Sequence, residues 1–172
     1  MAEKLAKSLI GMMGGLLSLS FGKELIVFII SMLPILELRG GLIAASLLKL
    51  PPLESYIIAI VGNVIPVPFI LLLINRILRA MEKSRFKLFK GIHSFLHKKI
   101  MKNKDSIEKY GFWGLVIFVG IPLPGTGAWT GAIIAAFLEM DRKKAFAGIL
   151  LGMLMASIIM MIISFGLISK VA

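Results

Sequence analysis

The chain alternates between long apolar runs and short stretches that contain charges, glycines or prolines. The apolar runs cover residues 25–48, 54–79, 110–139 and 145–168. A helix that crosses the hydrocarbon core of a bilayer needs about 20 predominantly apolar residues, and each run reaches that length. The pattern therefore predicts an all-α integral membrane protein with a single membrane domain over residues 1–172.

Two of these runs predict full-length transmembrane helices. Residues 145–168 carry no charge, so they form the simpler of the two. Residues 54–79 are equally apolar but contain Asn63, Pro66 and Pro68. Proline lacks the N–H that a helix interior requires, so this helix is expected to be kinked or partly unwound.

The N-terminal segment is shorter. Residues 8–22 would cover about 22 Å as a helix, which is less than the hydrocarbon core. They either cross a thinned bilayer or lie at its interface, and the sequence leaves both alternatives open. Lys4 and Lys7 precede this segment like the start of a signal peptide. No small-residue cleavage site follows, so the segment is expected to be retained as an N-terminal helix over residues 1–22.

The other two apolar runs are interrupted near their centres. Pro34 and the pair Gly40-Gly41 break the first run, and the stretch from Gly120 to Gly127, with two prolines, breaks the second. No helix is expected to continue through either break. The half-helices predicted around the two breaks include residues 24–33, 41–49 and 128–139.

The two halves of the chain align without gaps at an offset of 90 residues. The spacing from proline to glycine is kept, and a charged turn and a long apolar segment follow in both halves. Internal repeats with interrupted helices are typical of transporters. Repeat 1 covers residues 23–79 and repeat 2 covers residues 110–169. The aligned pairs include Pro34 with Pro124, Gly41 with Gly131, and Gly62 with Gly152.

Positive charge predicts the topology of these repeats. Lys and Arg are concentrated in the linker 80–109 and in the turn at 140–144. The positive-inside rule places both on the cytoplasmic side of the cell membrane. The segment 110–140 must then enter and leave by the same face, which makes it a re-entrant hairpin. By the repeat, 24–50 is a second re-entrant hairpin. The single helix between them makes the two repeats inverted.

The composition restricts the partners of the protein. The net charge is +11, and the linker carries lysines around apolar residues at helical spacing. This pattern predicts a basic amphipathic helix on anionic lipids, rather than a nucleic-acid site. Two long helices and two hairpins make a thin core, so a homodimer is possible.

Few residues suggest catalysis or metal binding. Cysteine is absent, which excludes disulfides and thiolate sites. His93 and His97 have metal-ligand spacing but no evident third ligand, and lysines surround them. No catalytic triad is evident. We therefore expect no enzyme activity, no metal and no cofactor.

Glu37 and Arg39 are the candidate functional charges, because both lie within an apolar run, where charge is costly. Two opposed hairpins would bring their tips together near the membrane midplane. Each tip starts a half-helix whose positive dipole end favours an anion, and Arg39 adds a forked donor set. Glu37 could accept and release a proton, or the two charges could form a static structural pair.

The remaining candidates for the substrate or ion site carry no charge. Structural explanations compete with each of them: turn formation for the prolines and glycines, a membrane-interface anchor for Trp129, and a helix–helix hydrogen bond for Asn63. The candidates are Pro34, Gly40, Gly41, Asn63, Pro122, Pro124, Gly125, Thr126, Gly127, Trp129 and Thr130.

The stretches Leu33–Gly41 and Gly120–Gly131 resemble the putative small multi-drug export protein family, over most of residues 20–170. The layout is also similar to the DedA, or VTT-domain, membrane proteins. That likeness implies inverted re-entrant hairpins, proton-linked transport and movement of lipid phosphates such as a polyprenyl carrier. DedA proteins typically carry acidic residues in the first loop and arginines in the second. Here both charges lie in the first tip, so the functional roles that the DedA likeness implies extend only to Glu37 and Arg39.

Three functions follow from this pattern. The first is a proton- or ion-coupled transporter that moves an anionic or amphiphilic small molecule through the midplane site. The second is a DedA-like translocase or scramblase for polyprenyl phosphate or phospholipid. The third is a non-transporting membrane scaffold in which Glu37 and Arg39 are structural.

Overall fold

The computed structural model describes residues 2–82, 109–123 and 125–167. All the regular structure in these residues is helical, which confirms the predicted all-α class. The predicted linker helix falls on residues 83–108 and lies outside the described residues. The elements are α1 (Ala2–Met12), the 3₁₀ helix η1 (Gly14–Ser18), α2 (Gly22–Met32), α3 (Glu37–Leu47), α4 (Pro52–Val64), α5 (Pro66–Glu82), the helix Lys109–Gly120, α7 (Ala128–Phe137), α8 (Arg142–Met161) and the π-helix η2 (Ile162–Leu167).

The N-terminal segment does not form one helix over residues 8–22. Helix α1 ends at Met12, and η1 follows after a single residue. Helix α1 packs against α3, and Ala6 is fully buried there. Within the part of the chain that the structure describes, the helices long and apolar enough to cross a membrane are Pro52–Ile74 and Arg142–Gly166.

The first hairpin breaks earlier than the sequence predicted. Helix α2 matches the expected half-helix, but α3 starts at Glu37 instead of residue 41. Gly40 and Gly41 therefore lie inside a helix and do not break it. They allow close packing, because a Cβ on Gly41 would lie 1.9 Å from the Ser31 hydroxyl oxygen. The break falls on residues 33–36, where Pro34 disfavours a helical conformation of the residue before it.

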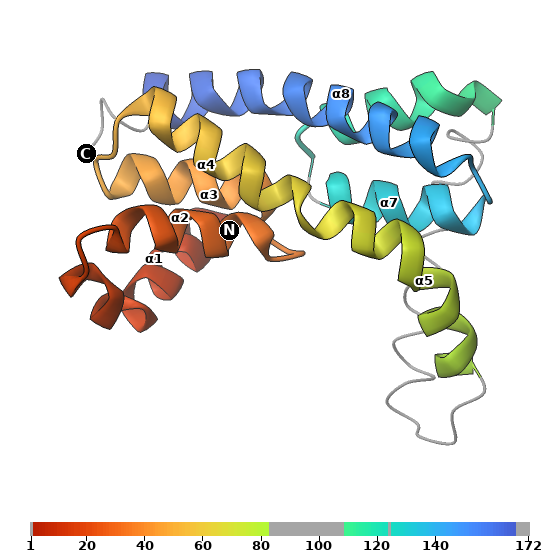
Figure 1. Cartoon of the computed structure of the whole chain (residues 1–172). Coiled ribbons are helices and arrows are strands. Elements are labelled where there is room, and N and C mark those ends of the chain that lie inside the picture. The colour runs from red at the N-terminus through yellow and green to blue at the C-terminus, as the bar shows by residue number, and fades with distance from the viewer. Residues whose placement is uncertain (1, 83–108, 124, 168–172) are drawn as a thin grey trace.

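The interruption predicted within residues 54–79 is present. Helix α4 ends at Val64, and α5 starts at Pro66. Neither Pro66 nor Pro68 can donate to the preceding turn, so the ladder of backbone hydrogen bonds is broken at this point. In Figure 1 α5 first continues roughly in the direction of α4 and then turns downward along its own length.

The second hairpin has the predicted order of helix, break and helix. The helix Lys109–Gly120 leads into an irregular turn, and α7 follows from Ala128. Gly125 and Gly127 have φ angles of 87° and 147°, in the region that favours glycine. Helix α8 begins at Arg142, three residues before the predicted start. The carboxylate of Asp141 accepts a hydrogen bond from the Lys144 N–H at 3.0 Å, which caps the helix.

The two hairpins also end alike at the offset of 90 residues. Lys49 follows α3 with φ 57°, and Glu139 follows α7 with φ 53°. In each case a backbone hydrogen bond of 3.0–3.1 Å closes the turn, from Leu50 N to Ala45 O and from Met140 N to Ala135 O. This is the Schellman arrangement, here with non-glycine residues in the left-handed position.

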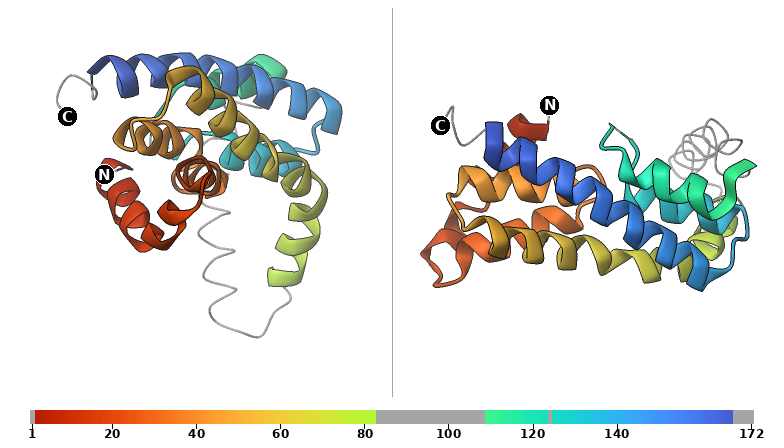
Figure 2. Two further views of the ribbon diagram at one scale, coloured as in Figure 1. Left: turned by 60° about the vertical axis from the view of Figure 1, so that its left-hand side comes forward. Right: turned by 90° about the horizontal axis from the view of Figure 1, so that it is seen from above.

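The hairpins lie end to end, and their broken tips meet at the centre of the molecule (Figure 1). Helices α2, α3 and α4 enclose one core, and α5, α7, α8 and the helix Lys109–Gly120 enclose the other. Helix α8 runs antiparallel to α4 and reaches both cores (Figures 1 and 2). The tips therefore meet between two packed blocks.

Candidate functional site

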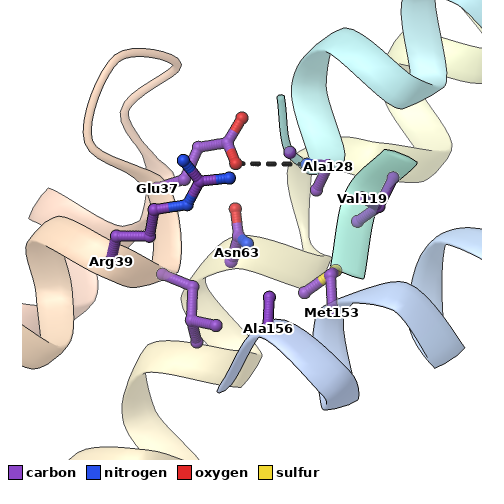
Figure 3. Close-up of a pocket in the computed structure, with 9 residues that line it drawn as sticks. Glu37, Arg39, Asn63, Val119, Ala128, Met153 and Ala156 are labelled. Carbon is purple, nitrogen blue, oxygen red and sulfur yellow. Dashed lines mark hydrogen bonds between the residues drawn. The ribbon is translucent and has the colours of Figure 1, made fainter. Parts of the chain in front are cut away.

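Glu37 from the first tip caps a helix of the second hairpin. Its carboxylate oxygens accept hydrogen bonds from the N–H groups of Ala128 and Trp129, each at 3.1 Å. Figure 3 shows the bond from Ala128. These groups begin α7, whose own cap residue, Gly127, has no side chain. Glu37 is 6% exposed and has a φ angle of 50°, which is rare for a residue with a side chain. A charged carboxylate at a helix N-terminus is a favourable arrangement.

Gly127 makes this capping possible. A Cβ at position 127 would lie 2.0 Å from Oε2 of Glu37. The φ angle of 147° also disfavours any residue with a side chain. The sequence suggested a turn-forming role for this glycine. The structure adds that Gly127 leaves room for a carboxylate from the other hairpin.

Arg39 binds the backbone carbonyl groups of the second tip. Its guanidinium donates to the carbonyl oxygens of Leu123, Thr126 and, at 3.5 Å, Ile121. It also donates to the Thr126 hydroxyl at 3.1 Å. The oxygen of that hydroxyl lies 2.8 Å from the carbonyl oxygen of Ile121 and 2.9 Å from that of Leu123, and its single proton is available to either. These carbonyl groups follow the C-terminal end of the helix Lys109–Gly120, where a cation is favoured.

Trp129 makes the corresponding contact in the opposite direction. Its indole N–H donates to the carbonyl oxygen of Met32 at 3.2 Å, and Met32 is the last residue of α2. Positions 39 and 129 correspond at the offset of 90. Each side chain therefore binds carbonyl groups at the end of the other hairpin's first helix. The tips are joined by a reciprocal exchange of polar contacts.

A small cavity lies beside these contacts. Its volume is about 10 Å³, which is the room that one water molecule needs. Asn63 of α4 is 2% exposed and points into the cavity toward Glu37 (Figure 3), and among the described residues its Oδ1 has no hydrogen-bond partner. The cavity is lined by Glu37, Leu38, Arg39, Asn63, Val119, Gly127, Ala128, Met153 and Ala156.

The other predicted site residues lie in different environments. Pro34 and Gly125 are exposed in the turns, whereas Gly40 and Gly41 are buried inside α3. Thr126 and Trp129 join the tips without lining the cavity. Pro122 and Thr130 are half-buried and also outside its lining, and Pro124 lies outside the described residues.

Sequence reasoning missed the apolar half of the cavity. The offset of 90 contains a signal for part of it, because Glu37 corresponds to Gly127, Leu38 to Ala128 and Asn63 to Met153. Both members of each pair line the cavity. Repeat 1 thus contributes the polar member of two pairs, and repeat 2 the apolar or glycine member. The missed residues are Leu38, Val119, Ala128, Met153 and Ala156.

The fold and the site define the class of the protein. Two apolar helices are long enough to cross a bilayer, and between the tips of the two broken hairpins Glu37 is buried and Arg39 is half-buried. The sequence model of the family described as "Putative small multi-drug export protein" matches residues 37–159. The chain belongs to this family, and the family and the two apolar helices together indicate a membrane protein. No curated protein and no solved structure gives a match. The likeness to DedA proteins stays a prediction.

Proposed function

We propose that this protein is an ion-coupled membrane transporter that moves an anionic or amphiphilic small molecule between the two hairpin tips. The observation that carries the proposal is the pair of contacts from Glu37 and Arg39 to the backbone of the second tip. Broken helices that meet around charged groups near the centre of the membrane are the arrangement in which transporters bind their substrates. The family name also agrees with an export function.

In this proposal the hairpins are re-entrant and the repeats are inverted. Helices α2 and α3 each have 11 residues, so each is about 16 Å long, or half the thickness of the hydrocarbon core. The antiparallel course of α4 and α8 supports an inverted relation of the two repeats. The linker 80–109 and the loop 140–144 are proposed to lie on the cytoplasmic side of the cell membrane, with the linker against anionic lipid. The proposed oligomer is a homodimer.

Glu37 is the proposed coupling residue. As a carboxylate it accepts from two N–H groups of α7 and holds the tips together. A protonated carboxyl has no net charge and is a weaker partner for these N–H groups. Proton uptake would therefore loosen the contact between the hairpins. Arg39, whose guanidinium stays charged, would keep the second tip attached until the substrate competes for it.

Transport by purified protein in liposomes tests the proposal. Carboxyfluorescein serves as an anionic amphiphile and ethidium as a cationic one, with a pH gradient imposed across the vesicle wall. Carboxyfluorescein is expected to move faster than in protein-free vesicles. Glu37→Gln and Arg39→Ala are each expected to abolish this acceleration. Transport unchanged by both substitutions would contradict the proposal. A fluorescent phospholipid added in parallel tests the translocase alternative, and a scaffold would move none of the three probes.

A further inference from the structure

The N-terminus of α3 is the counterpart of the helix end that Glu37 caps. At α7 the carboxylate binds the N–H groups of Ala128 and Trp129. At the offset of 90 the equivalent groups are the N–H groups of Leu38 and Arg39. Within residues 2–82, 109–123 and 125–167, no hydrogen bond from either N–H is found. Position 127 is the equivalent of Glu37, and its glycine has no side chain to reach them.

Asn63 provides a second, independent indication of a ligand. Its side chain is almost fully buried and lines the same cavity as Leu38 and Arg39, and in the part of the chain that the structure describes nothing binds its Oδ1. Leaving a buried amide oxygen without a hydrogen-bond partner is unfavourable unless something binds it. The amide carries an acceptor at one end and two donors at the other, and a half-turn of the side chain exchanges them. Asn63 can therefore present N–H groups to a ligand at this helix end.

We propose that the N-terminus of α3 and Asn63 together bind a carboxylate group of the transported molecule, an inference that rests on the proposed function. The chain shows the chemistry at the equivalent position, where one carboxylate satisfies two successive N–H groups with one oxygen on each. The Asn63 amide adds a third donor. The nearby Arg39 guanidinium adds positive charge, and proton uptake by Glu37, which loosens the tips in the proposed function, removes the nearby negative charge.

The size of the cavity defines the state that is observed. Room of about 10 Å³ admits one water molecule or one oxygen atom, but not a whole carboxylate. The conformation is therefore closed over the site. A carboxylate enters when the tips separate, and its binding favours the more open conformation.

Propionate is the probe for this site, with propionamide as its neutral counterpart and chloride as the ionic-strength control. The readout is thermal unfolding of the full-length protein in detergent. Propionate at about ten times its Kd should raise Tm by about 3 °C, and the two controls should not. Asn63→Leu should weaken propionate binding at least tenfold. Asn63→Asp keeps the volume but adds a negative charge, and should abolish binding at pH 7.

Tyr56→Phe is the matched control, since it removes a polar group from the same helix. The Tyr56 hydroxyl lies 3.1 Å from that of Ser157, and neither residue lines the cavity. This variant should bind propionate like the original protein. Absence of propionate binding, or equal binding by Asn63→Leu or Asn63→Asp, would overturn the inference.

The binding and transport results separate this inference from the proposed function. Carboxyfluorescein transport that depends on Glu37, without any Asn63-dependent propionate binding, would overturn the carboxylate site alone. If propionate binding depends on Asn63 but no probe is transported, the proposed transport function is overturned and the carboxylate-binding site still stands.

Discussion

The two hairpin tips share a backbone plan but differ in how they take part in the contact. The first tip contributes charged side chains, Glu37 and Arg39. The second contributes mainly backbone groups: the N–H groups that begin α7 and the carbonyl oxygens of residues 121–126. The charges of the first tip therefore depend on the open backbone of the second tip, which binds them.

This difference explains why the second tip contains no charged residue. Glycine at position 127 admits the carboxylate, and the irregular turn before it directs carbonyl oxygens toward Arg39. The polar character of the second tip lies in its main chain, where amino-acid identity does not reveal it. Substitutions on either side of the contact test how far the two tips depend on each other.

The largest effect is expected from Gly127→Ala. The added Cβ would collide with the Glu37 carboxylate, and the φ angle of 147° would strain the new residue. Strain and the loss of the cap together should lower the free energy of unfolding by about 3–5 kcal/mol. Thermal or denaturant unfolding in detergent measures the change. Gly11→Ala is the matched control, because no atom lies within 4 Å of a Cβ there, and it should not destabilise the protein.

A double variant shows whether the collision is the cause. Combined with Glu37→Ala, Gly127→Ala should cost less than it does alone, because the carboxylate it meets is gone. If its cost were the same in both backgrounds, the backbone conformation of Gly127 would be responsible, and the contact between the tips would not.

Arg39→Met should have the next largest effect. It keeps a long apolar chain but leaves the carbonyl groups of the second tip without their cationic donor. Removing one partner from such a charge-assisted set costs about 3 kcal/mol. Arg39→Lys is the informative companion, because an ammonium keeps the charge and loses the fork that reaches several oxygens. It should recover less than half of the lost stability. Full recovery would show that charge alone matters.

Much of the fold could be predicted because its signals are local. Prolines and glycines mark the breaks, and the offset of 90 residues relates the two hairpins. The error at Gly40 and Gly41 has a physical cause. Glycine ends helices, but it also lets helices pack closely, and only the position of Ser31 on α2 distinguishes the two roles. That position depends on tertiary structure.

The candidate site could be predicted only in part for a related reason. Glu37, Arg39 and Asn63 were evident because polar groups are costly in an apolar run. The partners of Glu37 and Arg39 are mainly backbone groups, which the sequence does not distinguish. The apolar residues that line the cavity, such as Val119 and Met153, cannot be told from other core residues in the sequence. The sequence therefore identified the side chains of the contact better than the backbone groups that they bind. At one of the two helix ends of the predicted anion-favouring centre, the group bound is an internal carboxylate.

Glu37→Gln should have a smaller effect on stability than either change above. The amide oxygen can still accept one hydrogen bond from α7, but the attraction between a full charge and the helix end is lost. We expect a loss of about 1–2 kcal/mol. Hydrogen exchange at the Ala128 and Trp129 amides measures it locally and should become faster. Unchanged protection of both amides would mean that the carboxylate charge does not hold the tips together.

The smallest effect is expected from Trp129→Phe, which tests the contact in the reverse direction. The ring is kept, but the donor to the Met32 carbonyl is lost. A single neutral hydrogen bond within a membrane protein contributes about 1 kcal/mol or less. Trp113→Phe is the control, because that indole is 65% exposed, and the structure should tolerate it. If Trp129→Phe and Trp113→Phe lowered the stability equally, the Trp129 contact would not contribute. The first tip alone would then provide the side chains that join the hairpins.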